Sequence, residues 1–447
     1  MTVTPPMTAE RAAEIAAGFD LRDLPPDFYT NPYPVYAALR HAEPVRRMPD
    51  GSIFLTRYAD IVSVYRDAKV FSSDKKVEFG PKYNGDNGDD GAPSGTAQPV
   101  SPLFEHHTTS LVFNDPPAHT QVRRLIVGAL TRRAIADMES GLIALVDSLL
   151  DQIEARAAAG EPCDLIEDYA SVIPVEIIGN LLNIPHADRA PLRDWSLAIL
   201  GALEPRLTPA QQHSGEQAVR DFLDYLRHLV AERRSRPGDP ERDVLTRLIQ
   251  GEAGTEGETL SEQALLHNCI FILNAGHETT TNLIGNALAA LQEWPDQKAN
   301  LLSKIQLSGH DPQALEAVLG LAIDEFLRFE ASNQLSNRRA IQDCNVGGVD
   351  LPQGSLITMC IGAANRDPAQ FALPETLDLA RETAGKHLSF GFGIHQCVGL
   401  SLARMEGRVA IGRFLQRFPD YRLTAPPVRG GRARFRGFLK MPFHPGS

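Results

Sequence analysis

The chain has 447 residues, of which 43% are hydrophobic and 22% charged, the composition of a globular protein with a sizeable core. Its formal net charge of −12 argues against a general nucleic-acid binder, because such proteins present positive charge to phosphates. The sequence shows no signal-peptide layout and no apolar run of about 18 residues, so we expect no membrane span. The five cysteines are odd in number and form no CxxC pair. This pattern favours a reducing, cytoplasmic location over a disulfide framework or a zinc site.

In chain order, the first predicted elements are a short helix over residues 34–40 and strands near 44–46 and 53–58. Residues 73–110 are rich in polar residues and glycine, and we expect a long irregular loop there, near the active site. Between residues 116 and 250, apolar residues recur every three or four positions, which predicts a series of helices.

The second half of the chain begins with a nearly all-apolar stretch, residues 261–293, which predicts a long, buried central helix. The later elements are a helix over 314–328, a β-hairpin over 346–361 around residues 352–354, and a final helix over 399–418. No repeat divides the chain. We therefore expect a single domain over residues 1–447, mainly α with a small β portion.

The sharpest local feature is the segment HLSFGFGIHQCVG, residues 387–399, which surrounds Cys397 with Gly391, Gly393 and Gly399. Glycine permits close backbone approaches that a Cβ would block, so the loop can lie flat against a large planar ligand and present one sulfur to it. The N-terminus of the helix that follows favours the thiolate form of that sulfur. A lone cysteine is more often a buried structural residue, but the glycine pattern favours a ligand.

The string from Phe390 to Gly399 matches the haem-binding signature of the cytochrome P450 family at every fixed position, and the chain resembles a soluble, bacterial-type member. The resemblance implies the mainly α P450 fold and haem b as the cofactor. It also implies that Cys397 ligates the iron and that Phe390, Gly391 and Gly399 belong to the haem-binding loop. A thiolate ligand pushes electron density onto haem iron and promotes O–O cleavage.

A second motif is Glu325 and Arg328, which lie three residues apart on a predicted helix and can pair there. Such a spacing alone is common on protein surfaces. Upstream of the cysteine loop, it resembles the structural ExxR motif of the family. Arg338, downstream, resembles the arginine that binds a haem propionate. The chain departs from the family at residues 331–332, Ala-Ser, where proline is common.

The third motif is NDPPAHTQVR, residues 114–123. Asp115 and the prolines suit a helix start, and His119 and Arg123 fall one turn apart on the same face. Two donors so placed can bind a carboxylate, and the alternative is a capped helix start with exposed charges. The segment resembles the family's DPPxHxxxR motif, whose histidine and arginine hold haem propionates. By the same resemblance, His395 contacts a propionate.

The fourth motif is AGHETT, residues 275–280, within the long apolar helix. Polar residues are costly there unless they have a purpose. A zinc-protease HExxH motif is excluded because Thr281 stands where it requires histidine. The hydroxyl of Thr279 can bond back to the carbonyl of Ala275 and bend the helix. The resemblance implies that Glu278 and Thr279 are the acid–alcohol pair that supplies protons during dioxygen activation, and that Ala275 lies against the haem.

The resemblance implies an oxidoreductase, a haem-thiolate monooxygenase that uses dioxygen and two electrons. It would insert one oxygen atom into a small organic substrate, by hydroxylation or oxidative demethylation. The segment after Cys397 is too short for a reductase domain, so we expect electrons from a separate ferredoxin and ferredoxin reductase. An acidic ferredoxin would dock on the basic residues Arg123, Arg124, Arg404 and Arg408.

Two alternatives stay open at this point. One is a peroxide-driven peroxygenase, although such an enzyme would not need the Glu278–Thr279 pair. The other is a haem-thiolate sensor without turnover. The candidate substrate contacts of the monooxygenase combine apolar side chains with a few polar groups. By resemblance they are Phe113, Leu273, Asn274, Ser332, Leu335 and Phe438. Asn274 lies one turn before Glu278 and can hydrogen-bond a polar substituent.

Overall fold

The computed structural model describes residues 7–84, 100–240, 243–251, 259–309 and 311–446. The chain packs as two compact units. The first unit is Met1–Ser72, Ile143–Ala170 and Thr279–Ser447, and the second is Ser73–Leu142 and Ser171–Glu278. Two long helices, α8 (Arg132–Ala158) and α13 (Glu262–Glu293), contribute residues to both units. The expectation of a single domain stays a prediction.

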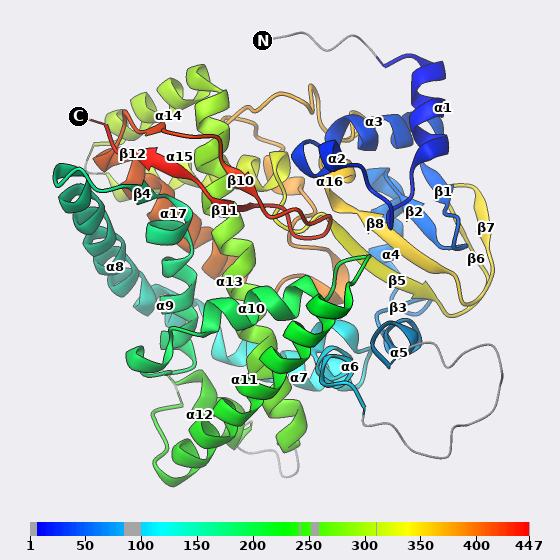
Figure 1. Ribbon diagram of the computed structural model, residues 1–447, viewed down its shortest axis with the longest axis horizontal. Coiled ribbons are helices and arrows are strands. Elements are labelled where there is room, and N and C mark those ends of the chain that lie inside the picture. Colours follow the sequence, from blue (N-terminus) through cyan, green and yellow to red (C-terminus); the bar gives the residue numbers. More distant parts are fainter. Residues whose placement is uncertain (1–6, 85–99, 241–242, 252–258, 310, 447) are drawn as a thin grey trace. The chain divides into compact units, whose positions relative to one another are not determined.

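The first unit contains a five-stranded sheet (Figure 1). Its strands, in spatial order, are β1 (Val45–Arg47), β2 (Ile53–Leu55), β8 (Leu356–Cys360), β5 (Leu335–Ala340) and β3 (Phe71–Ser72). The β2–β8 pair is parallel and the other pairs are antiparallel. Ile53, Leu55, Ile357 and Met359 from these strands are buried in one hydrophobic cluster with Ile61 of α4 (Tyr58–Arg66). This cluster fixes the sheet against α4.

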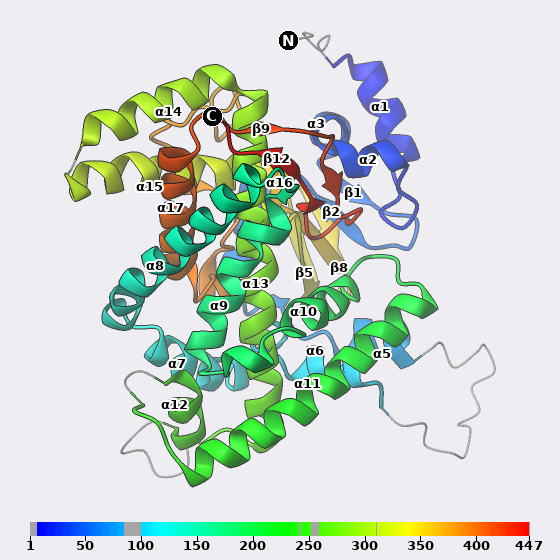
Figure 2. The same cartoon turned by 60° about the vertical axis from the view of Figure 1, so that its left-hand side comes forward.

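Apart from α4 and the parts of α8 and α13 that belong to it, the helices of the first unit lie in two groups. Beside the sheet are α1 (Ala9–Gly18), α2 (Pro26–Thr30), α3 (Tyr33–Ala42) and α16 (Ile361–Ala364), with α3 packed on α1 and α16. The other group is the neighbouring pair α14 (Pro295–Ser308) and α15 (Pro312–Phe329), with α17 (Leu400–Arg417) against both (Figure 2). The start of α15 is encoded locally, because the Asp311 side chain accepts hydrogen bonds from the amides of Gln313 and Ala314 and Pro312 occupies the first turn.

The remaining strands of the first unit form three small sheets. These are β6 (Cys344–Val346) with β7 (Val349–Leu351), β10 (Val428–Arg429) with β11 (Phe438–Lys440), and the order β4 (Cys163–Asp164), β12 (Pro442–His444), β9 (Arg422–Leu423). The C-terminal strands therefore join parts of the chain that are far apart in sequence.

The second unit is helical within the residues that the structure describes. Its α-helices are α5 (Lys76–Asn84), α6 (Pro102–Thr109), α7 (Ala118–Ala129), α9 (Val172–Leu181), α10 (Leu192–Gly201), α11 (Pro209–Ser235), α12 (Val244–Gln250) and the first parts of α8 and α13. Figure 2 shows α10 beside α11, and α6 also packs on α11. A capping box between Thr208 and Gln211 starts α11.

The predicted fold class, mainly α with a small β portion, is confirmed. The helices predicted over 261–293, 314–328 and 399–418 correspond to α13, α15 and α17 with boundaries within two residues. None of the described helices is long and apolar enough to cross a membrane.

The prediction of a long irregular loop over residues 73–110 is wrong in part. The structure forms α5 and α6 within it, and residues 85–99 lie outside the described residues. Two features hid these helices. Gly80 and Pro81 lie inside α5, and both are poor helix formers. The buried face of α6 carries histidine beside leucine, so the sequence shows no apolar residues at helical spacing there.

The prediction of a hairpin over residues 346–361 is also wrong. The hairpin is formed by β6 and β7, with its turn at Gly347 and Gly348, whose φ angles are 59° and 87°. The strand after Pro352 is β8, which pairs with β2 and β5 in the five-stranded sheet. Two adjacent glycines with positive φ suit a tight hairpin turn, whereas the Pro-Gln-Gly turn redirects the chain to another sheet.

Candidate active site

The cysteine loop of the first unit lies directly before α17, as the sequence predicts. The amide of Cys397 donates to the carbonyl of Phe390 at 2.8 Å, which closes the loop, and the amide of Gln396 donates to Gly393 at 3.0 Å. Cys397 is a half-buried thiol, and none of the five cysteines forms a disulfide. Because α17 begins at Leu400, three residues after Cys397, the positive end of its dipole lies close to the sulfur in sequence and favours the thiolate.

The glycines of this loop have different structural roles. Gly391 and Gly393 have φ angles of 65° and 73°, in the region that favours glycine. A Cβ on Gly393 would collide with the backbone oxygen of Tyr65, which belongs to α4. A Cβ on Gly399, by contrast, meets no atom of the described protein within 4 Å. Gly393 therefore lets the loop dock on α4, and Gly399 keeps open the surface beside Cys397.

The predicted Glu325–Arg328 pair lies in α15 and is fully buried. Arg328 donates to both carboxylate oxygens of Glu325, at 2.7 and 2.8 Å. Arg381 completes the cluster by donating to the same two oxygens at 3.2 and 3.1 Å. Arg381 could not be predicted from the sequence, because it lies 56 residues from Glu325 and no local spacing relates the two.

The Glu325 cluster is connected to the cysteine loop through Asn365. Arg328 donates to the Asn365 carbonyl at 2.9 Å, and the Asn365 side chain accepts from the amide of Leu388 at 2.7 Å. The Asn365 amide also donates to the Ser389 hydroxyl at 2.8 Å, which in turn donates to the Leu327 carbonyl of α15 at 2.7 Å. These bonds hold the beginning of the loop on α15, so the role of the ExxR motif here is structural.

The predicted propionate ligands lie on separate elements. In the first unit, Arg338 is a buried residue of β5 whose guanidinium lies 5.3 Å from the centroid of the Tyr65 ring, and His395 is half-buried in the cysteine loop. Tyr65 thus contacts Arg338 through its ring and lies next to the loop through its carbonyl. In the second unit, His119 is buried and Arg123 half-buried in α7.

The central helix α13 carries the predicted oxygen-activation residues. Glu278 is buried and Thr279 half-buried, one turn after Ala275. Ala275 is exposed although Asn274 before it and His277 after it are buried. Residues 271, 275 and 279, each one turn from the next, form an accessible stripe on an otherwise largely buried helix, and this stripe carries a small side chain at its centre.

Three of the predicted substrate contacts have clear structural partners in the first unit. The Ser332 hydroxyl donates to the Thr279 carbonyl of α13 at 2.8 Å, which fixes the segment before β5 against this turn of α13. Leu335 is buried in a hydrophobic cluster that includes Tyr36 and Phe54, so packing accounts for this residue. Phe438 is buried, and the guanidinium of Arg429 lies 3.9 Å from its ring centroid.

The other predicted substrate contacts belong to the second unit. Phe113 follows α6, and its ring meets those of Phe79 and His107 edge-on, with centroids 5.2 and 5.8 Å apart. Leu273 is fully buried in α13. Asn274 is buried beside it.

Two of the basic residues that we expect to meet a redox partner already have acidic neighbours in α15. Arg404 donates to Asp324 at 2.8 Å, and its guanidinium lies 4.9 Å from the ring centroid of Phe390. Arg408 forms an ion pair with Glu316. These partners reduce the positive charge that the two arginines present.

The residues present fit the haem that the sequence predicts. The first unit offers a thiol at the N-terminus of α17, a glycine beside it whose missing side chain leaves the surface open, and a buried arginine on β5. In α13, the stripe around Ala275 offers a small, accessible face of the kind that a flat ligand covers. A thiolate suits an iron atom, and arginine and histidine side chains suit the carboxylates of the propionates.

Comparisons with known proteins agree with this interpretation. Residues 197–427 match the family model described as Cytochrome P450. Cytochrome P450 107B1 of Saccharopolyspora erythraea is 37% identical over 342 residues, which cover 75% of this chain and 77% of that protein. The vitamin D(3) 25-hydroxylase of Pseudonocardia autotrophica is 34% identical and covers 89% of each chain. The solved structure of the polyketide synthase cytochrome P450 PksS of Bacillus subtilis 168 matches with a TM-score of 0.79 at 28% identity, covering 96% of this chain and all of that one. The chain therefore belongs to the cytochrome P450 family, and it is a monooxygenase that binds haem b through an iron–thiolate bond.

Proposed function

We propose that the protein inserts one oxygen atom of dioxygen into a small organic substrate, by hydroxylation or oxidative demethylation, with electrons from a ferredoxin and its reductase. The observation that carries the proposal is the half-buried Cys397 thiol, held by its amide bond to Phe390 at the start of α17. Relatives named vitamin D(3) 25-hydroxylase and 6-deoxyerythronolide B hydroxylase support hydroxylation. A cytoplasmic location is part of the proposal and is supported by five cysteines that form no disulfide.

The bound haem supplies the site at which dioxygen is reduced. In this proposal Cys397 would hold the iron, with Phe390, Gly391 and Gly399 in the ligand loop. His119, Arg123, Arg338 and His395 would hold the propionates. A charge-assisted hydrogen bond of this kind contributes about 1.5–3 kcal/mol to retention of the group.

Glu278 and Thr279 transfer protons in this proposal. Glu278 is buried in α13, and Thr279 beside it lies on the accessible stripe of the same helix. The Glu278 carboxyl would pass protons inward, and the Thr279 hydroxyl would hold a proton by a hydrogen bond from its Oγ1 atom. The Ser332 hydroxyl, bonded to the Thr279 carbonyl, positions this turn of the helix. Positioned proton transfer contributes about 10²–10⁴-fold in rate.

The test uses the haem-loaded protein with ferredoxin, reductase and a turned-over substrate. Cys397→Ala should lose the thiolate band of the ferrous carbon monoxide spectrum. Glu278→Gln should slow product formation with haem content unchanged, and Thr279→Ala should divert electrons to hydrogen peroxide. The measured quantities are product and peroxide per electron pair consumed. A thiolate band that survives in Cys397→Ala would refute the ligand assignment, and unchanged coupling in both α13 variants would favour a peroxygenase or a sensor.

A further inference from the structure

Asp324 in α15 stands directly before Glu325 in the chain, but its carboxylate makes a different set of contacts. Its Oδ1 atom accepts a hydrogen bond from Nε of Arg404 in α17 at 2.8 Å and lies 3.6 Å from Nε2 of His387. A Cβ on Gly385 would lie 3.2 Å from Oδ2, so the backbone before the cysteine loop passes close to the same carboxylate. The side chain of Asp324 is 20% exposed and that of His387 only 1%. Asp324 therefore joins α15 both to α17 and to the segment that leads into the cysteine loop.

Both partners of Asp324 contact the ring of Phe390. The guanidinium of Arg404 lies 4.9 Å from the ring centroid, within the range of a cation–π interaction. The imidazole of His387 has its centroid 5.3 Å from that of the same ring, at a tilt of 52°. The carbonyl of Phe390 in turn accepts the hydrogen bond from the amide of Cys397 at 2.8 Å. A continuous chain of contacts thus runs from Asp324, through one aromatic residue, to the residue that carries the sulfur.

The charges in this chain of contacts follow from the geometry. Nδ1 of His387 accepts from the amide of Ser389 at 3.1 Å, so the proton of the neutral ring is on Nε2, the atom nearest Asp324. Burial lowers the pKa of His387 against the opposite effect of Asp324, and the ring is therefore neutral at neutral pH. Burial raises the pKa of Asp324, but His387 and Arg404 together hold it below its usual value. An anionic carboxylate thus faces one imidazole N–H group and one guanidinium.

A second ion pair of α17 shows what a purely structural pair looks like. Arg413 pairs with Asp147 of α8, and their side chains are 38% and 34% exposed. The exposure of Arg404, 35%, is similar. The Asp147 pair joins two helices, whereas the Asp324 pair also places its arginine against the ring of Phe390. The two pairs therefore differ mainly in their connection to the cysteine loop.

We propose that Asp324 is a positioning residue for the thiolate ligand Cys397. It holds Arg404 and His387 against the ring of Phe390. The ring held in this way keeps the Phe390 carbonyl on the amide of Cys397, and so maintains the loop conformation from which the sulfur is presented. The inference rests on the proposed function, because this conformation matters only if the sulfur holds the iron. Without the carboxylate, the guanidinium is free to turn toward solvent and the imidazole loses the anion that its N–H group faces, so the loop relaxes.

The test measures how fast the haem-loaded protein loses the thiolate band of its ferrous carbon monoxide spectrum in a fixed, moderate concentration of urea. Asp324→Asn keeps the shape of the side chain and removes its charge. It should speed the loss of the band on the order of tenfold, because one charge-assisted hydrogen bond no longer opposes the change. Arg404→Gln should also speed the loss. The double variant should lose the band no faster than Asp324→Asn alone, because the contact of Arg404 with the ring depends on the carboxylate.

Asp147→Asn is the matched control. It removes the same charge and one ion pair from the same helix, and should lose the band within about twofold of the wild-type rate. Far-UV circular dichroism in the same urea follows the helices, which should stay folded while the band decays. If Asp324→Asn takes up no haem, Arg404→Gln replaces it in the comparison with Asp147→Asn, with an expected acceleration of about threefold or more.

The proposal is overturned if Asp324→Asn, or Arg404→Gln in its place, loses the band no faster than Asp147→Asn. It is also overturned if the effects of the two single variants multiply in the double variant, or if the helices unfold as fast as the band decays. A normal wild-type band with unaffected variants refutes only the role of Asp324. A wild-type protein without the thiolate band refutes the proposed function and this inference with it.

Discussion

At the scale of single residues, Gly393 shows how the cysteine loop depends on a distant part of the chain. Its φ of 73° and its approach to the Tyr65 carbonyl both exclude a side chain. Gly399, six residues later, has a φ of −91° and open space where a Cβ would lie. The two glycines of one motif therefore differ in their tolerance of a side chain, although nothing in the sequence distinguishes them.

Gly393→Ala should accordingly lower the free energy of unfolding by about 2–4 kcal/mol and reduce haem retention, because both the loop and α4 must shift. Gly399→Ala should cost less than about 1 kcal/mol, since alanine is only a poorer N-cap than glycine. Urea unfolding of the two haem-loaded variants, followed by circular dichroism and haem absorbance, measures both. Equal losses in the two variants would show that the Tyr65 contact does not constrain the loop.

Glu406 of α17 is a second residue with a distinct physical consequence. It is buried, its Oε2 atom has no hydrogen-bond partner among the described residues, and burial raises its pKa from 4.5 to about 8. Between these two values the unfolded chain ionises and the folded protein does not. Stability that is present below pH 4.5 is therefore lost progressively as the pH rises to about 8.

Glu406→Gln removes this titration and keeps the shape of the side chain. The variant should become increasingly more stable than the wild type from pH 5 to pH 8, by at most about 1.4 kcal/mol per pH unit, and the difference should then level off. Unfolding free energies at several pH values within this window measure the effect. Parallel profiles of wild type and variant would mean that Glu406 does not titrate in this range.

At the scale of elements, the Glu325 cluster joins α15 to the segment that leads into the cysteine loop. Arg328 also donates to the carbonyls of Pro374 and Thr376, and Glu325 accepts from the amide of Asp378 at 2.9 Å. The carboxylate is thus shared between two guanidinium groups and a backbone amide. Removing it leaves two buried cations together, whereas removing Arg381 leaves a complete pair.

This asymmetry predicts different costs for the two substitutions. Glu325→Gln should lower the free energy of unfolding by about 3–5 kcal/mol, and Arg381→Met by about 1–3 kcal/mol. Arg11→Ala, which breaks an exposed pair with Glu14, is the control and should cost less than about 0.5 kcal/mol. Chemical denaturation of the three variants gives the comparison. A loss in Arg381→Met as large as that in Glu325→Gln would contradict the proposed sharing.

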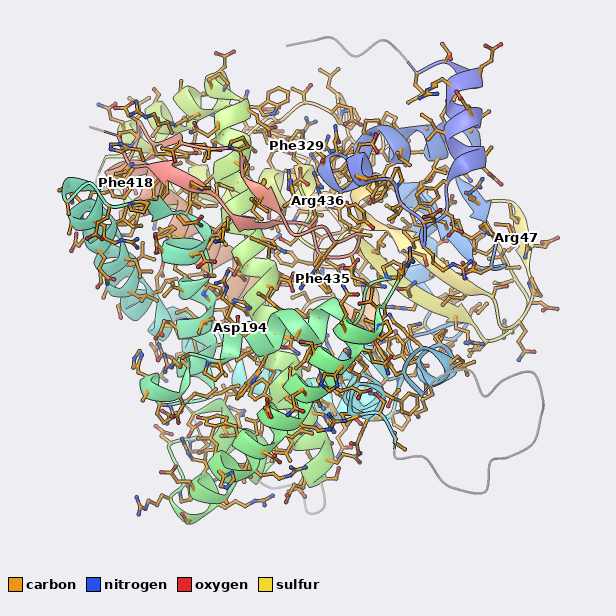
Figure 3. The ribbon with its side chains drawn as sticks, viewed as in Figure 1. Arg47, Asp194, Phe329, Phe418, Phe435 and Arg436 are labelled. Carbon is orange, nitrogen blue, oxygen red and sulfur yellow. The ribbon has the colours of Figure 1, made fainter. Side chains whose placement is uncertain are left out.

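At the scale of the whole chain, the C-terminal segment holds the N-terminal helices in the first unit through Arg436. This buried side chain pairs with Glu330 and donates to the carbonyls of Tyr29 and Thr30 at 2.9 and 2.8 Å. The amide of Arg436 also donates to the carbonyl of Ser332 at 2.8 Å, next to the bond between Ser332 and α13. Arg436 is buried, whereas Arg47, labelled near the edge of the view in Figure 3, is exposed.

Arg436→Ala should therefore destabilise the protein by about 3–5 kcal/mol, because Glu330 loses its ion-pair partner inside the fold and two carbonyls lose their donors. Arg47→Ala, a loss of the same charge from an exposed position, should change stability by less than about 0.5 kcal/mol. Thermal unfolding with and without haem measures both variants. Similar shifts in melting temperature in the two variants would show that the buried interactions of Arg436 add little to the stability of the protein.

Periodicity and short motifs in the sequence were sufficient to predict several elements, one buried ion pair and the family of this protein. The apolar stretch over 261–293 predicted α13, and the glycine-bracketed Cys397 indicated the family, because each signal depends on residues close together in the chain. Spacing alone also predicted the pairing of Glu325 with Arg328, which the structure confirms.

Only the tertiary structure decided the features that depend on contacts between distant segments. These include the third partner Arg381, the collision that requires Gly393, and the contacts of Asp324 with Arg404 and His387. Likewise, α6 buries histidines that look like surface residues in the sequence, and β8 joins the large sheet instead of forming a hairpin with β7. The physical reason is the same in each case. Local spacing fixes which face a side chain occupies, but the partners that satisfy or exclude it arrive only when remote parts of the chain pack together.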